Sequence, residues 1–141
     1  MFRSVAVFCA AAIAIGISVT SANAAQTTIT LPSGLHWLSD TPKGGTSAYQ
    51  YAVIRGKEGK CDTIYRNKFP DGFVFPWHTN RFYGIYTVLQ GTLVIGFDKS
   101  HATSAEKMLP AGSVMEGLLE PHYGRAIGET IFDVYALCGV H

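Results

Sequence analysis

The sequence predicts an all-β protein that folds as a single small barrel. Short segments rich in β-branched and aromatic residues recur along the chain, separated by Gly, Pro and Asp, as in sandwiches and barrels. Helical periodicity is almost absent, and the one candidate for a helical turn, residues 101–107, is too short to organise a fold. A chain of 141 residues has room for one domain of this kind.

The beginning of the chain has the pattern of a secretory signal peptide. Arg3 is followed by an uncharged apolar run and then by Ala22-Asn23-Ala24, which is typical of cleavage after Ala24 or Ala25. An uncleaved membrane anchor is the alternative, but the run is short for a span of about 20 residues. We therefore expect a signal peptide at 1–25, a folded domain at 26–141, and a periplasmic or secreted protein.

The first half of the domain contains three candidate strands. TTITL at 27–31 is expected to form a first strand or an N-terminal arm. YQYAVI at 49–54 alternates apolar and polar residues, and CDTIYRNKF at 61–69 alternates again. Pro70-Asp71-Gly72 then marks a turn.

The second half continues with strands and tight turns. Residues 83–89 and 92–97 flank Gln90-Gly91, which predicts a hairpin in which the glycine takes a positive φ. Residues 107–119 have a Pro-Ala-Gly turn in their middle, and 130–137 form the last expected strand. The 7 tyrosines and 8 phenylalanines, most of them in these segments, would line the barrel interior.

Composition argues against some classes of partner. The chain has 11 Lys and Arg against 10 Asp and Glu, without a basic run, so neither nucleic acid nor a membrane surface is an expected partner after signal cleavage. Cys61 and Cys138 remain in the mature chain. They form one disulfide, as an oxidising compartment allows, or stay as separate thiols.

His78 and His122 are the candidate functional histidines, since each lies at the end of an apolar segment where a strand passes into a loop. Residues 78 and 80 share one face of an extended chain. A His-x-His pair there would offer two nitrogens to a metal, but this sequence has Asn80, whose amide oxygen is a weaker ligand. The residues alone leave a hydrogen-bonded pocket dyad and a metal site open.

The stretch from Gly72 to Gly91 resembles the first motif of the cupin superfamily. That motif consists of a glycine, a His-x-His pair, a glutamate and a second glycine at fixed spacing, and Gly72, His78 and Gly91 occupy matching positions. Asn80 replaces the second histidine and Gly84 replaces the glutamate. The scaffold glycines are therefore retained while the ligand set is half replaced.

A second cupin half-motif resembles LPAGSVMEGLLEPHYGRA at 109–126, with Gly112 near its start and His122 as its histidine. GTLVIGFDK, PHYG and GETIFDVYALCG are similar to small exported bacterial cupins of largely unassigned role. The resemblance covers nearly the whole mature chain. It implies a cupin-type β-barrel, also called a double-stranded β-helix or jelly roll, and a homodimer that pairs through sheet edges and the arm at 29–31.

In metal-binding cupins the ligands are the two histidines and the glutamate of the first motif and the histidine of the second motif. The resemblance therefore implies a weakly held divalent ion (zinc, manganese, nickel or iron) on His78, Asn80 and His122, completed by water. Three carboxylates, Glu116, Glu120 and Asp133, are alternative ligands, and we favour solvent-facing positions for them.

Without a metal, His78 and His122 could act as general acid and base toward a bound substrate. Candidate ligand-binding residues at the barrel mouth are four tyrosines and two arginines: Tyr83, Tyr86, Tyr123, Tyr135, Arg81 and Arg125. The arginines would hold an anionic group, or would serve only solubility.

Three functions follow from these patterns. The first is an enzyme acting on a small oxygen-rich molecule, and the second is a module that binds such a ligand without turnover. The third is a structural protein whose pocket has closed around two buried histidines. Whether the protein is an enzyme is left open by the sequence.

Overall fold

A computed structural model describes residues 26–140 of the chain; the predicted signal peptide at 1–25 and the terminal His141 lie outside the described residues. Eight strands and two single-turn 3-10 helices follow one another in this order: η1 (Pro32–Gly34), β1 (Leu38–Asp40), β2 (Tyr49–Arg55), β3 (Thr63–Phe69), β4 (Val74–His78), β5 (Tyr83–Gly96), η2 (Thr103–Ala105), β6 (Glu106–Pro110), β7 (Val114–Gly117) and β8 (His122–Leu137). Within residues 26–140, no helix has the length and apolarity needed to cross a membrane.

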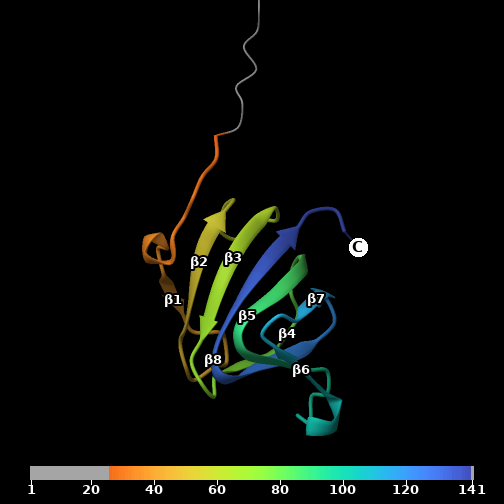
Figure 1. Ribbon diagram of the computed structural model, residues 1–141. Coiled ribbons are helices and arrows are strands. Elements are labelled where there is room, and N and C mark those ends of the chain that lie inside the picture. Colours follow the sequence, from red (N-terminus) through yellow and green to blue (C-terminus); the bar gives the residue numbers. More distant parts are fainter. Residues whose placement is uncertain (1–25, 141) are drawn as a thin grey trace, which may run out of the picture.

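Two long strands, β5 and β8, connect the two sides of the barrel (Figure 1). The first half of β5 pairs with the second half of β8, and this side continues through β3, β2 and β1. The second half of β5 pairs with the first half of β8. On this side β4 pairs with the other edge of β8, and β6 pairs with the other edge of β5. Every pairing is antiparallel, which agrees with the predicted all-β fold class.

The prediction of a hairpin at Gln90-Gly91 is wrong. Gly91 has the expected positive φ of 68°, but β5 runs through it without reversing. The register against β8 shifts between Val88 and Gln90 and again between Gln90 and Thr92, so the glycine forms a bulge that bends the strand. A glycine at positive φ serves a bulge as well as a turn, and only the pairing with β8 distinguishes the two.

Other predicted segments agree with the structure. Residues 49–54 and 61–69 correspond to β2 and β3, and 130–137 is the second half of the longer β8. The segment 27–31 forms no strand; Figure 1 shows it extending away from the barrel, and Ile29 is 80% exposed. A strand needs a neighbouring strand for its backbone groups, and none of the described strands pairs with this segment.

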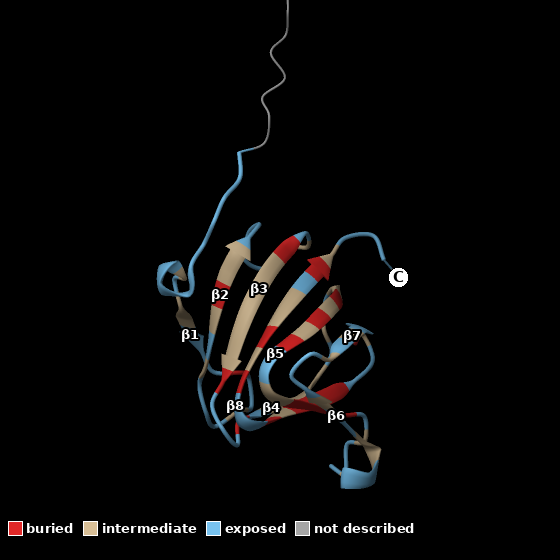
Figure 2. Cartoon of the chain, viewed as in Figure 1, coloured by how far each residue is buried: buried red, intermediate tan, exposed pale blue. Residues whose placement is uncertain are grey.

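The interior is packed with aromatic rings. Figure 2 shows buried residues along β5 and β8, with further ones at the ends of β3. The ring centroids of Phe69 and Phe73 are 4.3 Å apart, and Phe132 meets Phe69 edge-on at 5.0 Å. Aromatic pairs in these geometries add to the stabilisation from burial. This cluster fills one part of the barrel and leaves the rest hollow.

A disulfide joins Cys61, in the loop before β3, to Cys138, just after β8, with the Cα atoms 5.1 Å apart. Of the two alternatives for these cysteines, the structure contains the disulfide. It ties together two segments separated by 77 residues, and a crosslink over a loop of this length restricts the unfolded chain strongly.

The bend of β5 provides a test of the architecture. An alanine at Gly91 would place Cβ 2.4 Å from the carbonyl oxygen of Glu129, whereas Gly128, at the matching bend of β8 with φ 70°, has open space around it. We expect Gly128→Ala to lower the free energy of unfolding by about 1 kcal/mol, from backbone strain alone. Gly91→Ala should lower it by about 3 kcal/mol or more, because a backbone clash is added. Urea denaturation of both variants checks this, and equal losses would contradict the bulge geometry.

Candidate functional site

A cavity of about 370 Å³ lies inside the barrel. Its wall contains the aromatic residues Tyr49, Tyr51, Tyr65, Phe69, Phe75 and Phe132 together with the aliphatic residues Leu93, Ile95, Leu118 and Val134. Its polar lining consists of Asp40, Glu58, Asn67, His78, Asn80, Tyr86 and His122. A cavity of this size with a few convergent polar groups is typical of small-molecule sites.

His78 and His122 come together because β4 pairs with β8. They are direct partners in the antiparallel register, and side chains opposite each other in such a pair lie close together. Their ring centroids are 4.3 Å apart, in an edge-to-face arrangement. His122 is only 2% exposed, while His78 is half-buried. The structure therefore brings the two predicted histidines into one site.

Backbone carbonyls orient both imidazole rings. Nδ1 of His78 lies 2.6 Å from the carbonyl oxygen of Pro76, and Nδ1 of His122 lies 2.7 Å from that of Glu120. A carbonyl can only accept, so each Nδ1 carries the proton and donates it. In the neutral rings, Nε2 is then left with a free lone pair. Among the described residues, every fully buried side-chain nitrogen or oxygen has a hydrogen-bond partner. Nε2 of His122 has no such partner, so this atom is not fully buried and reaches the open cavity.

Burial keeps both rings neutral. Desolvation lowers the pKa of His78 below its ordinary value, partly offset by the carbonyl of Pro76 and the side chain of Asn80, which favour the protonated ring. Desolvation also lowers the pKa of His122, and the nearby His78 contributes in the same direction. At neutral pH the site therefore presents two unprotonated nitrogens, which can accept a proton or bind a metal.

Asn80 is held between two groups of the cavity wall. Its Nδ2 donates to the hydroxyl of Tyr86 at 2.8 Å and to the carbonyl of Leu118 at 3.1 Å. Leu118 is buried and has a positive φ of 60°, a conformation that is strained for leucine. Because Nδ2 is occupied, the amide oxygen of Asn80 is left to face the histidines and the cavity.

Tyr86 explains why position 84 is a glycine. A Cβ at Gly84 would lie 2.6 Å from the Tyr86 ring, so the ring occupies the space that a side chain at 84 would need. Burial raises the pKa of Tyr86 to about 12, and its hydroxyl accepts the hydrogen bond from Asn80 while keeping its own proton to donate. Gly84, Tyr86 and Asn80 therefore form one arrangement, in which the tyrosine ring fills the space beside residue 84 and its hydroxyl binds Asn80.

Of the other predicted ligand-binding residues, five lie away from the cavity lining. Tyr83 and Tyr135 alternate with inward residues of β5 and β8, and Tyr135 is 44% exposed on the outer surface. Arg81 is exposed, with its guanidinium over the ring of Phe82. A ligand inside the barrel would not meet these side chains.

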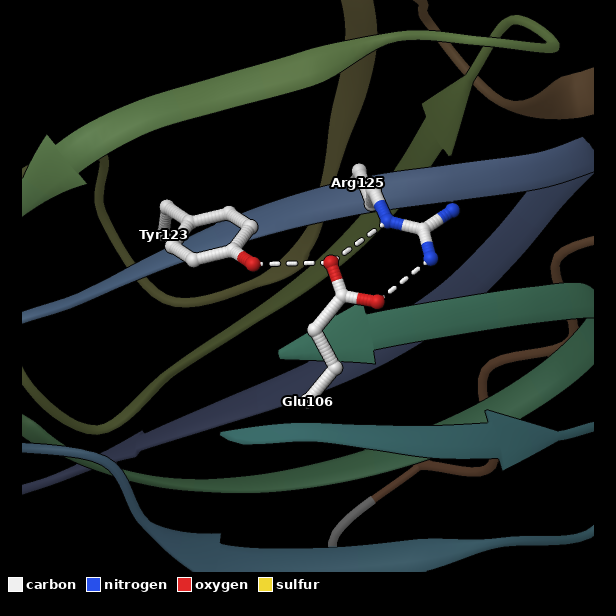
Figure 3. A network of polar contacts seen from close by, with 3 residues as sticks. All are labelled: Glu106, Tyr123 and Arg125. Atoms are coloured by element: carbon white, nitrogen blue, oxygen red, sulfur yellow. Dashed lines mark hydrogen bonds and ion pairs between the residues drawn. The ribbon is translucent and has the colours of Figure 1, made fainter. Parts of the chain in front are cut away.

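Tyr123 and Arg125 face the other side of β8 from His122, and both bind Glu106 of β6 (Figure 3). The Glu106 carboxylate accepts from the Tyr123 hydroxyl at 2.7 Å and from Nε of Arg125 at 2.8 Å. These bonds lower the pKa of Glu106 to about 2. The predicted role of Arg125 as an anion-binding group has no support from this placement, because its guanidinium is already paired.

The carboxylates considered as substitute ligands also lie elsewhere. Asp133 forms an ion pair with Arg66 on the outer surface, and Glu116 and Glu120 are exposed. Among residues 26–140, only the group Cys61, Asp62 and Cys138 brings together three ligand-type side chains, and its two thiols form the disulfide. Within the described chain, no carboxylate or thiol completes the histidine pair.

Several cavity residues were not among the predicted site residues, although the tyrosines were expected to line the barrel interior. Tyr51, Tyr65 and Asn67 point inward from β2 and β3, and Asp40 and Glu58 lie at the exposed end of the cavity. Alternation in the two strands could have identified the inward tyrosines, since residues 49 and 51 share one face. The position of Glu58 in a loop has no comparable signal.

Comparison with known proteins identifies similar structures only. No protein-family model matches the sequence, and no curated protein matches it. A predicted oxalate decarboxylase from Thermotoga maritima has a TM-score of 0.59 at 19% identity, over 78% of this chain and 99% of that one. The polyketide cyclase RemF from Streptomyces resistomycificus has a TM-score of 0.62 at 13% identity, over 80% of each chain. An RmlC-like cupin from Shewanella frigidimarina has a TM-score of 0.56 at 14% identity, over 81% of this chain and 94% of that one. At these identities the likeness concerns the fold alone.

The lowered pKa values of the two histidines predict how stability depends on pH. Both lie below the ordinary value of 6.5, so the unfolded chain binds more protons than the folded one once the pH falls below about 6.5. The stabilisation is complete above that pH and is lost as the pH decreases, by up to about 1.4 kcal/mol per pH unit for each histidine.

The double variant His78→Gln/His122→Gln should show a smaller loss of unfolding free energy from about pH 7 to pH 5, measured by urea denaturation. The variant His36→Gln changes an exposed histidine and serves as control. An unchanged slope in the double variant would show that the site histidines do not resist protonation.

Proposed function

Because the chain has the cupin fold, as its two motifs predicted, we propose that it binds a small oxygen-rich molecule in the barrel cavity through His78 and His122. One observation carries the proposal. Two neutral imidazoles, each held by a backbone carbonyl at Nδ1, line a cavity of about 370 Å³. Two of the similar structures are named for reactions of oxygen-containing molecules, a predicted oxalate decarboxylase and a polyketide cyclase, which supports this class of ligand.

The polar groups of the site complement such a ligand. A ligand hydroxyl can donate to Nε2 of either histidine, and a ligand carbonyl can accept from the hydroxyl of Tyr86. A neutral imidazole can also remove a proton from the ligand, and the bond from Nδ1 to a backbone carbonyl stabilises the resulting cation. His78 and His122 would then act as the general base and acid of an enzyme.

A divalent ion fits this site only as a weakly held group. The donors would be Nε2 of His78, Nε2 of His122 and the amide oxygen of Asn80, a set that lacks an anionic ligand. Zinc, manganese, nickel or iron would supply Lewis-acid chemistry when bound. Tyr86, whose ring fills the space beside Gly84, leaves no room for the carboxylate of a stronger site.

The alternative function is binding of the same molecule without turnover. The lining of the cavity suits it as well, since aromatic rings make up much of its wall and hydrogen-bonding side chains such as His78 and Asn80 are set among them. A closed, purely structural pocket is less well supported, because an open cavity reaches both histidines.

We also propose that the protein acts in the periplasm or outside the cell. The signal pattern at 1–25 and the disulfide between Cys61 and Cys138 are consistent with an oxidising compartment. A homodimer remains a proposal from the cupin resemblance, in which the exposed Ile29 and Leu31 of the arm would pack on a second copy.

Ring signals of the histidines in NMR spectra test the binding site. We expect fragments such as small polyols and diketones to shift the signals of His78 and His122, because their Nε2 atoms face the cavity. Signals of the exposed His36 and His101 should stay in place. Binding fragments that leave both site histidines unchanged would refute the proposal, and release of a chemically altered fragment would distinguish an enzyme from a binding module.

The metal-binding part of the proposal has its own test. Zinc or nickel should bind weakly, and Asn80→His should raise the affinity at least about tenfold, because a third imidazole completes a usual donor set. Thr79→His is the matched control, since residue 79 is exposed and adjacent. Isothermal titration calorimetry measures the affinities. Equal gains in both variants would show that the site does not present its donors to one ion.

A further inference from the structure

The open end of the cavity is built from tyrosine rings. Tyr49 and Tyr51 lie with ring centroids 5.9 Å apart on β2, and Tyr65 lies on the neighbouring strand β3. The backbone amide of Gly59 donates to the hydroxyl of Tyr65 at 2.9 Å, which fixes this ring against the loop between β2 and β3. These three tyrosines and Glu58, with Asp40, are called the cavity mouth below.

The charges at the cavity mouth all have one sign. Asp40 and Glu58 are exposed acidic residues of the lining, and no Lys or Arg lines the cavity in the described part of the chain. Tyr51 donates its hydroxyl to Oε1 of Glu58, which positions the carboxylate beside the rings. One carboxylate has several lone-pair sites, so this bond leaves the group able to accept from a ligand.

The combination of aromatic faces and carboxylates selects for positive charge. Aromatic rings attract cations within about 6 Å of their centroids, and the attraction grows where water is excluded. An anionic ligand would meet two like charges here and no cationic partner. The predicted anion-binding arginines, Arg81 and Arg125, lie outside the cavity, so nothing offsets this polarity.

The cavity mouth and the histidine pair line one cavity. Tyr65, Val134 and Tyr86 are successive partners across β3, β8 and β5. Because neighbouring strands are about 4.8 Å apart, the backbones of Tyr65 and Tyr86 are roughly 10 Å apart. One small molecule can therefore contact both ends. At the inner end, the nearly fully buried His122 keeps an Nε2 with no protein partner among the described residues.

We propose that the ligand carries a cationic group, an ammonium, which binds at the cavity mouth among Tyr49, Tyr51 and Glu58 while its polar end reaches His78 and His122. The inference rests on the proposed function for the inner end and adds the chemical class of the outer end. It predicts a ligand that contains an amine or a quaternary ammonium group.

Choline and 3,3-dimethylbutan-1-ol test this inference, because they have the same shape and differ in the charge of one atom. We expect choline to bind the purified protein about tenfold more tightly than the neutral alcohol, measured by NMR titration at low ionic strength. Glu58→Gln should reduce this preference several-fold, and Tyr51→Leu should reduce it as well through loss of a ring. Glu116→Gln removes the same charge from an exposed site outside the cavity and should leave the preference unchanged.

The outcomes that would overturn the inference are specific. Equal affinity for the two probes, no saturable choline binding at millimolar concentration, or an equal effect of Glu58→Gln and Glu116→Gln would each refute a cation site at the cavity mouth. A cooperative unfolding transition in urea shows that each variant is folded before the titration.

The same titration separates failure of this inference from failure of the proposed function. A preference for choline without a shift of the His78 and His122 ring signals would retain the cation site and refute the role of the histidines. Shifts of those signals by polyol or diketone fragments, together with equal binding of choline and the alcohol, would do the reverse.

Discussion

The pairing of β5 with β8 is the interaction on which the rest of the structure depends. The two strands pair along most of their length, and both bend where Gly91 of one meets Gly128 and Glu129 of the other. Because both strands bend together, their hydrogen bonds continue on either side of the barrel. Thr130, fully buried at this corner, donates to the carbonyl of Thr92 at 3.2 Å and closes the gap in the ladder. The cavity exists because these strands curve around it.

The same two strands place the polar groups of the site. The first residue of β8 is His122, and its register against β4 brings His78 to it. Tyr86 points inward from β5, and its ring explains both departures from the first cupin motif. It occupies the space beside Gly84, and its hydroxyl is the partner of Asn80. The two substitutions are thus linked by one side chain, and the site has a consistent hydrogen-bonded arrangement of its own rather than a random loss of ligands.

Electrostatics along the cavity change from one end to the other. The inner end is neutral, because burial lowers the pKa of both histidines and raises that of Tyr86 to about 12. The outer end carries the carboxylates of Asp40 and Glu58. On the outer surface of β8, Glu106 and Arg125 compensate each other and do not contribute to this gradient. Under the proposed function, the charge of a ligand would be recognised at the opening and its hydrogen-bonding groups at the histidines.

The sequence by itself determined the fold class, because alternation, turn residues and the glycines of two motifs are local signals. It also determined His78 and His122 as the central pair, since motif spacing places them. It did not determine how Gln90-Gly91 is used, because a positive φ suits a bulge and a hairpin alike. It assigned Tyr123, Tyr135 and the arginines to the cavity, where only strand register decides which face a side chain occupies. The tertiary structure alone decided that Tyr86 fills the space beside Gly84 and that acidic and aromatic residues form the opening, because these groups meet only when distant strands and loops close around one space.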